Sequence, residues 1–160
     1  MNEGMRQSPI PQIVVTGSIF AKAASVVINA PAAKIFSELA NPRRHVEFDG
    51  SGHLQGHVTG PELLALGSRF GMSMKWQASY RTVNTVKEFE KDRLIAWSHF
   101  FKHRWRYQLL VIDERTTEVI ETFDARSALF PPILFLINAY GVNQRAVLTT
   151  LAMLKKLVEE

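Results

Sequence analysis

Between residues 67 and 124, large apolar residues alternate with polar ones in several segments separated by short turns. In the first segment Phe70, Met72 and Met74 alternate with charged or small residues. A two-residue period is typical of strands with one face in a core and the other in water. The segments are 67–76, 80–89, 93–101, 105–112 and 117–124. Connections of three or four residues force neighbouring strands to pair antiparallel, because a parallel crossover needs about a dozen residues. We therefore predict an antiparallel meander.

The flanking segments predict what covers this sheet. Residues 18–28 are expected to form an opening strand, and a short helix over 32–40 and a further turn over 43–48 follow it. Pro131-Pro132 is expected to begin a helix that runs to about Val158, roughly 40 Å at 1.5 Å per residue. Its predicted core stripe consists of Ile137, Leu148, Leu151, Leu154 and Val158.

The predicted fold class is therefore α+β. A curved antiparallel sheet of about seven strands wraps around a long C-terminal helix, and two short helices follow the first strand. A chain of 160 residues is expected to form one domain, over 18–160, after a flexible N-terminal tail over 1–17.

Composition excludes several classes of function. Cysteine is absent, which removes thiolate catalysis and zinc–thiolate sites and favours a reducing compartment. The formal net charge is +4, but Lys and Arg are scattered and form no dense stripe, so we expect no nucleic-acid partner. Residues 1–12 lack the apolar stretch of a signal peptide, and the longest apolar run, 129–137, is far shorter than the about 20 residues of a membrane span. We expect a soluble cytoplasmic protein with no integral membrane segment.

Three stretches of sequence carry a family resemblance. They are ASVVINAPAAKIF at 24–36, LANPRR at 39–44 and EFEKDRLIAW at 88–97. With the order of the expected elements, they resemble the START-like superfamily, also called SRPBCC, over about residues 18–158. The resemblance is closest to its polyketide cyclase/dehydrase and lipid-transport branch. It implies the helix-grip fold, with an internal apolar cavity between the sheet and the C-terminal helix.

The resemblance and the strand alternation together indicate which residues would line such a cavity. The polar candidates share their strand faces with aromatic residues, as His99 does with Trp97 and Glu121 with Phe123. The same residues could instead form an ordinary packed core. The full set of expected ligand-binding residues is Met72, Met74, Trp76, Trp97, His99, Tyr107, Glu121, Phe123, Tyr140 and Gly141.

Glu121, His99 and Tyr107 are the candidates for acid–base chemistry. Burial would raise the pKa of the Glu121 carboxyl and lower the pKa of the His99 imidazole, which suits both to proton transfer near neutral pH. Alternatively, these side chains lie at exposed strand ends or satisfy one another.

Metal and nucleotide sites have no support in the sequence. His53 and His57 have helix-like spacing, but the glycines around them predict extended chain, in which the two rings cannot share an ion. His45 and His103 are expected to be solvated in polar loops. Since no dinucleotide, phosphate-binding or serine-hydrolase motif occurs either, we expect no metal and no cofactor.

Three functions remain open from the sequence. The first is a carrier or sensor that binds a small hydrophobic molecule, such as a lipid, an isoprenoid or an aromatic polyketide. The second is a polyketide cyclase or dehydratase. The third is a protein-interaction module that uses the apolar segment 129–137. The expected partner is a small hydrophobic molecule, and the chain is expected to be a monomer or a homodimer.

Overall fold

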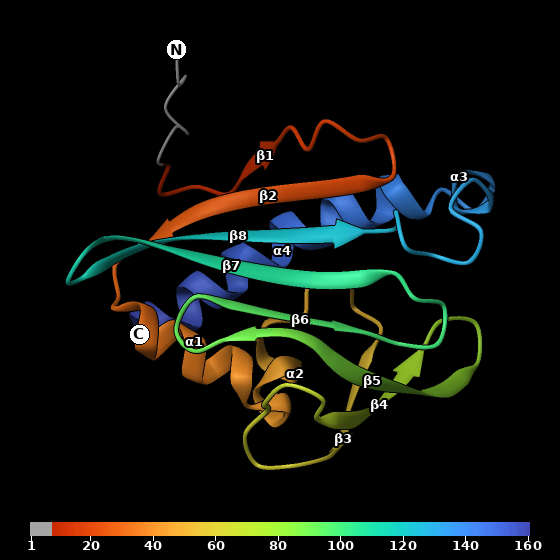
Figure 1. Cartoon of the computed structure of the whole chain (residues 1–160), viewed down its shortest axis with the longest axis horizontal. Helices are drawn as coiled ribbons and strands as arrows, with labels where there is room; N and C mark the ends of the chain where they lie inside the picture. Colours follow the sequence, from red (N-terminus) through yellow and green to blue (C-terminus); the bar gives the residue numbers. More distant parts are fainter. Residues whose placement is uncertain (1–7) are drawn as a thin grey trace.

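The computed structural model describes residues 8–160, in which one antiparallel sheet of eight strands curves around a C-terminal helix (Figure 1). The strand order is β1-β2-β8-β7-β6-β5-β4-β3. The strands are β1 (Gln12–Val14), β2 (Ala21–Ile28), β3 (Leu54–Thr59), β4 (Arg69–Lys75), β5 (Ser79–Glu90), β6 (Leu94–Ser98), β7 (Arg104–Asp113) and β8 (Thr116–Asp124). The helical elements are α1 (Ala32–Ala40), the 3-10 turn η1 (Pro42–Arg44), α2 (His45–Phe48), α3 (Ile133–Leu136) and α4 (Ala139–Glu159).

The α+β fold predicted from the sequence is confirmed. Each strand from β3 to β7 pairs with the next one along the chain, as the short connections require, and β2 pairs with β8. The outermost strand, β1, lies in the segment assigned above to a tail, where the sequence predicts no strand. It pairs with β2 over three residues. Residues 1–7 of that segment lie outside the described residues.

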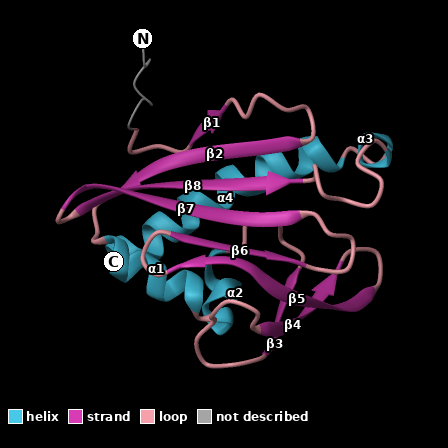
Figure 2. Cartoon of the chain, in the orientation of Figure 1, coloured by secondary structure: helices cyan, strands magenta, loops and turns pink. Residues whose placement is uncertain are grey.

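Strand register places the interior side chains in rows across the sheet. Tyr107 of β7 lies opposite Glu121 of β8, which lies opposite Ala24 of β2. Trp97 of β6 belongs to the neighbouring row, with Trp105 of β7. These rows face α4, which crosses the concave side of the sheet (Figure 2).

The short helices α1 and α2 cover the part of this concave side that lies lower in Figure 1. In α1 the residues Ile35, Phe36 and Leu39 are buried together, as their spacing predicts. The turn after α2 lies directly on α4, where the Gly50 amide donates to Thr150 Oγ1 at 2.9 Å. This contact holds the turn after α2 against α4, while His45 of α2 stacks on Trp97 of β6.

The long C-terminal helix is shorter than predicted. Two helices form in place of one, because the chain turns at Asn138, which has a left-handed φ of 52°. Asn tolerates this conformation better than most residues. Ile137 therefore lies outside the core, 58% exposed, and the prediction that it is buried is wrong. Leu151, Leu154 and Val158 are buried as predicted, and Leu148 is partly buried against the core (all in α4).

Candidate functional site

A buried pair of acidic groups lies at the centre of the concave face. The Tyr107 hydroxyl donates a hydrogen bond to Glu121 Oε1 at 2.8 Å. Both side chains are buried, and their positions opposite each other on β7 and β8 follow from the strand register. The second carboxyl oxygen, Glu121 Oε2, is also buried and has no hydrogen-bond partner among the described residues. The acidic pair thus leaves one polar atom available.

Burial determines the protonation state of this pair. It raises the pKa of the Glu121 carboxyl well above its usual value, although the bond from Tyr107 acts in the opposite direction. Burial, followed by the charge of Glu121, also raises the pKa of Tyr107. The raised pKa favours the neutral, protonated form of this carboxyl over the carboxylate. Because Oε1 accepts the hydrogen bond from Tyr107, a proton on the carboxyl would belong to Oε2, which has no acceptor among the described residues.

His45 of α2 supplies a second unpaired polar atom. Its Nε2 lies 2.8 Å from the carbonyl oxygen of Leu39. A carbonyl only accepts, so Nε2 carries the proton and Nδ1 has the free lone pair. Nδ1 is buried and unpartnered within residues 8–160. Burial lowers the pKa of His45 to about 4, so the ring is neutral at physiological pH.

Trp97 connects His45 with the acidic pair. The His45 ring stacks on Trp97, with centroids 4.8 Å apart and ring planes 19° apart. Trp97 also contacts Tyr107, at 5.4 Å between centroids. Phe70 closes the group edge-on to Trp97 at 5.6 Å. The arrangement places two unpartnered polar atoms, Glu121 Oε2 and His45 Nδ1, within an aromatic, otherwise apolar interior.

The prediction that His45 is solvated is wrong. Only 2% of the residue is exposed, because η1 and α2 turn it beneath Trp97. The one sequence signal for this burial is the apolar residue three positions later, Phe48, which shares the buried face of the short helix. This signal is too short to separate a buried turn from a loop.

The other predicted lining residues fall into two groups. Phe123 and Met72 are buried and Met74 is partly buried, all within or against the core. Tyr140 is buried, but its hydroxyl already donates to the carbonyl of Pro131 at 2.9 Å. Gly141 backs on the Asn138 side chain: a Cβ there would lie 2.5 Å from Asn138 Oδ1.

Trp76 lies outside the core. It follows the last residue of β4 in the hairpin turn and is 63% exposed, so the prediction that it lines an internal cavity is wrong. Strand alternation holds for Phe70 and Met72 and fails where the strand ends and the chain turns.

His99 also lies away from the acidic pair. It follows the end of β6, where its Nδ1 accepts the amide proton of Phe101, and its ring lies 4.3 Å from that of His103. Burial lowers the pKa of both rings, that of His103 to about 3. His103 Nδ1 is buried, so the prediction that His103 is solvated is also wrong.

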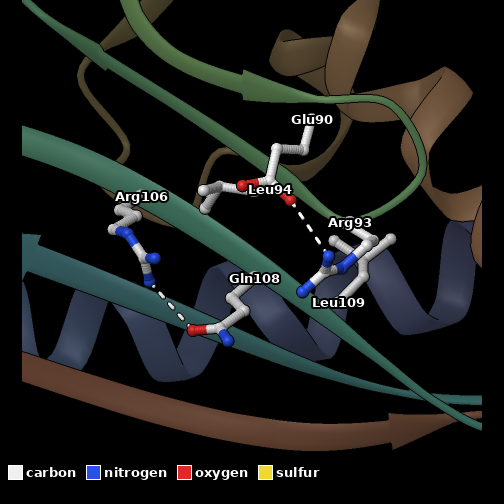
Figure 3. A pocket seen from close by; sticks show the side chains of 6 residues that line it. All are labelled: Glu90, Arg93, Leu94, Arg106, Gln108 and Leu109. Carbon is white, nitrogen blue, oxygen red and sulfur yellow. Dashed lines mark hydrogen bonds and ion pairs between the residues drawn. The ribbon is translucent and has the colours of Figure 1, made fainter.

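The hollows that the structure shows lie on the outer face of the sheet. One of about 100 Å³ is lined by Glu90, Arg93, Leu94, Arg106, Gln108 and Leu109, with an ion pair between Arg93 and Glu90 (Figure 3). Another of about 230 Å³ lies over β1, β2 and β8. Neither is lined by a predicted ligand-binding residue. Neither hollow is therefore the predicted internal cavity, and the residues around Trp97 belong to the hydrophobic core.

The described part of the chain contains neither a metal-binding cluster nor a membrane-spanning helix. No three His, Asp or Glu side chains gather closely enough to hold a metal ion. None of the helices of residues 8–160 is both long and apolar enough to cross a membrane.

Comparison with known proteins identifies relatives in sequence and in fold. No family model matches the chain. It is 41% identical over 105 residues to the uncharacterized protein Rv0088 of Mycobacterium tuberculosis, a match that spans 65% of this chain and 47% of that protein. The chain thus spans about half the length of this relative.

Solved structures share the fold at low sequence identity. Protein NE0264 from Nitrosomonas europaea matches with a TM-score of 0.67 and 11% identity, over 89% of this chain and 96% of that one. The Aha1 dimer from Colwellia psychrerythraea matches with a TM-score of 0.57 and 14% identity, over 87% and 96% of the two chains. The curved sheet around a C-terminal helix is therefore a fold shared with Aha1-like proteins.

Proposed function

We propose that this chain is a member of the START-like superfamily and binds a small apolar molecule between the sheet and α4, as a carrier or sensor. The fold neighbours support the superfamily, and the residue pattern quoted above agrees with it. The observation that carries the proposal is the buried, unpartnered Oε2 atom of Glu121 in an interior of aromatic rings. A buried polar group without a partner costs about 1–3 kcal/mol, which a ligand atom at this position would recover.

The polar atoms define the chemistry of the ligand. Glu121, when protonated, offers a donor, and His45 offers an acceptor. His45 stacks directly on Trp97, and Glu121 is linked to Trp97 through its hydrogen-bond partner Tyr107. A ligand hydroxyl group can accept from a donor of the first kind or donate to an acceptor of the second. We infer that the ligand is an apolar alcohol or enol, with its hydroxyl near Glu121 and its apolar body against the aromatic rings.

Entry of such a ligand requires side chains to move. Met72 and Met74 border the same interior on β4, and Met adapts to irregular space because its side chain is unbranched and flexible. Trp97 contacts three neighbouring rings, so its fluorescence reports on any rearrangement of this interior.

The experiment is a binding titration of the full chain with decanol and with decane, followed by native mass spectrometry and tryptophan fluorescence. The alcohol is expected to bind more tightly, and Glu121→Leu is expected to weaken its binding about tenfold, the effect of one buried hydrogen bond. Glu121→Gln retains a donor and is expected to retain binding.

Glu118→Leu is the matched control. Glu118 is a buried Glu of the same strand whose side chain, by alternation, points to the opposite face. Its replacement is expected to leave decanol binding unchanged. Equal affinity for the alcohol and the alkane, or no binding of either by a protein that purifies without a ligand, would show that the interior is an ordinary core.

A second candidate function follows from the same groups. A protonated Glu121 can act as a general acid and His45 Nδ1 as a base, which is the pair that a cyclase or dehydratase requires. Under this hypothesis Glu121→Gln retains binding and removes turnover by orders of magnitude, because only the proton transfer is lost. A Gln variant with unchanged turnover of any substrate found would exclude it.

A further inference from the structure

An apolar surface is exposed at one end of the molecule. It combines the β6–β7 loop with the segment that leads into α3, the two elements that lie toward the same end in Figure 1. The Leu129 amide donates to the Phe101 carbonyl at 3.3 Å, so the two elements are joined. We call this the apolar end surface, which consists of Phe100, Phe101, Leu129, Phe130, Ile133 and Leu136. Phe100, Phe130 and Leu136 are each more than 70% exposed.

This surface is held in place by the fold. Behind it, Phe135 of α3 packs on Tyr140 at 4.4 Å between ring centroids and on Phe20 at 6.0 Å. The Tyr140 hydroxyl holds the carbonyl of Pro131. In the other element, Lys102 has a positive φ of 65°, which turns the loop directly after the two exposed phenylalanines. The exposed side chains therefore belong to an anchored structure.

The two stretches of chain that contain the apolar end surface carry basic residues and no acidic ones. The sequence contains no Asp or Glu between Asp92 and Asp113, and none between Asp124 and Glu159. Asp124 itself pairs with Arg126. Arg104 pairs with Glu88 of β5 at 3.1 Å, whereas Lys102 and Arg145 form no ion pair within the described residues. An exposed apolar patch bordered by cations is the combination that binds the interface of an anionic bilayer.

We propose that the apolar end surface docks on an anionic lipid bilayer, with its apolar side chains among the lipid headgroups and Lys102 against lipid phosphate. A second copy of the chain fits less well. In a two-fold contact each residue meets the same region of its partner, so the basic border would face itself. The docking function goes beyond the proposed ligand site and does not depend on it.

The experiment is co-sedimentation of the full chain with vesicles of phosphatidylcholine alone and of an equal mixture with phosphatidylglycerol. Binding is expected to the mixed vesicles and to weaken as salt is added, because salt screens the charges. The variant Phe100→Ser/Phe130→Ser/Leu136→Ser is expected to remain in the supernatant. Lys102→Glu is expected to weaken binding to mixed vesicles about tenfold, since it reverses one charge at the membrane.

The control replaces three apolar residues elsewhere that are each more than 60% exposed, in Leu63→Ser/Leu66→Ser/Val111→Ser, which is expected to bind like the unchanged protein. Absence of binding to the mixed vesicles by the unchanged protein would overturn the proposal. So would equal losses in the two triple variants with both still folded by circular dichroism. A dimer in sedimentation velocity that only the Phe100/Phe130/Leu136 variant loses would assign the surface to self-association instead.

Discussion

At the scale of single residues, Glu121 makes stability depend on pH in one direction. Its pKa is raised in the folded protein, so the folded state holds the proton more tightly than the unfolded chain does. The resulting stability is complete below the unfolded pKa of about 4.3 and is lost as the pH rises through the folded pKa. Glu121→Gln, which retains an acceptor for Tyr107, is expected to match the unchanged protein near pH 4 and to exceed its unfolding free energy by about 1 kcal/mol or more at pH 8. Urea unfolding at several pH values measures this difference.

The buried histidines make stability depend on pH in the opposite direction. Their contribution can be separated from that of Glu121. The lowered pKa values of His45 and His103 give stability that is complete above about pH 6.5 and is lost as the pH falls through about 4 and about 3. Both the unchanged protein and Glu121→Gln contain these histidines, so the difference between them isolates the carboxyl. A constant difference across the whole pH range would contradict a buried, protonated Glu121.

At the scale of elements, Gly50 determines how closely α2 approaches α4. A Cβ at this position would lie 2.4 Å from the Thr150 nitrogen and 2.7 Å from the Ala146 carbonyl, both backbone atoms of α4. Backbone cannot move aside as a flexible side chain does, so Gly50→Ala is expected to lower the unfolding free energy by about 2 kcal/mol. It is also expected to displace His45 from Trp97, which changes the tryptophan emission.

Gly56→Ala is the matched control for this element. Gly56 lies in β3, and a Cβ there has no heavy atom within 4 Å. The substitution is expected to change the unfolding free energy by less than about 0.5 kcal/mol. If Gly50→Ala and Gly56→Ala change the unfolding free energy equally little in thermal or urea unfolding, the turn after α2 does not depend on close packing against α4.

At the scale of the whole molecule, α4 completes a core that the sheet cannot bury alone. Its residues Val147, Leu151, Leu154 and Val158 are all buried in the single hydrophobic core. A chain that ends at Pro131 is expected to lose cooperative unfolding in urea, because the concave face of the sheet would be exposed to water. In the full chain Leu151→Asp is expected to have the same effect. Met153→Asp, at an exposed position two residues later, is expected to unfold cooperatively.

The sequence by itself determined the fold class, the antiparallel meander of consecutive strands and the strand faces on which Tyr107 and Glu121 lie. These follow from the two-residue period and the short connections, which are local properties. Only the tertiary structure decided that His45 is buried on Trp97, that Trp76 is exposed and that the helix breaks at Asn138. Each of these depends on where a turn points and on what packs against it. Whether the interior is open or filled with side chains was decided at the same level, because packing of distant segments leaves no local signal in the sequence.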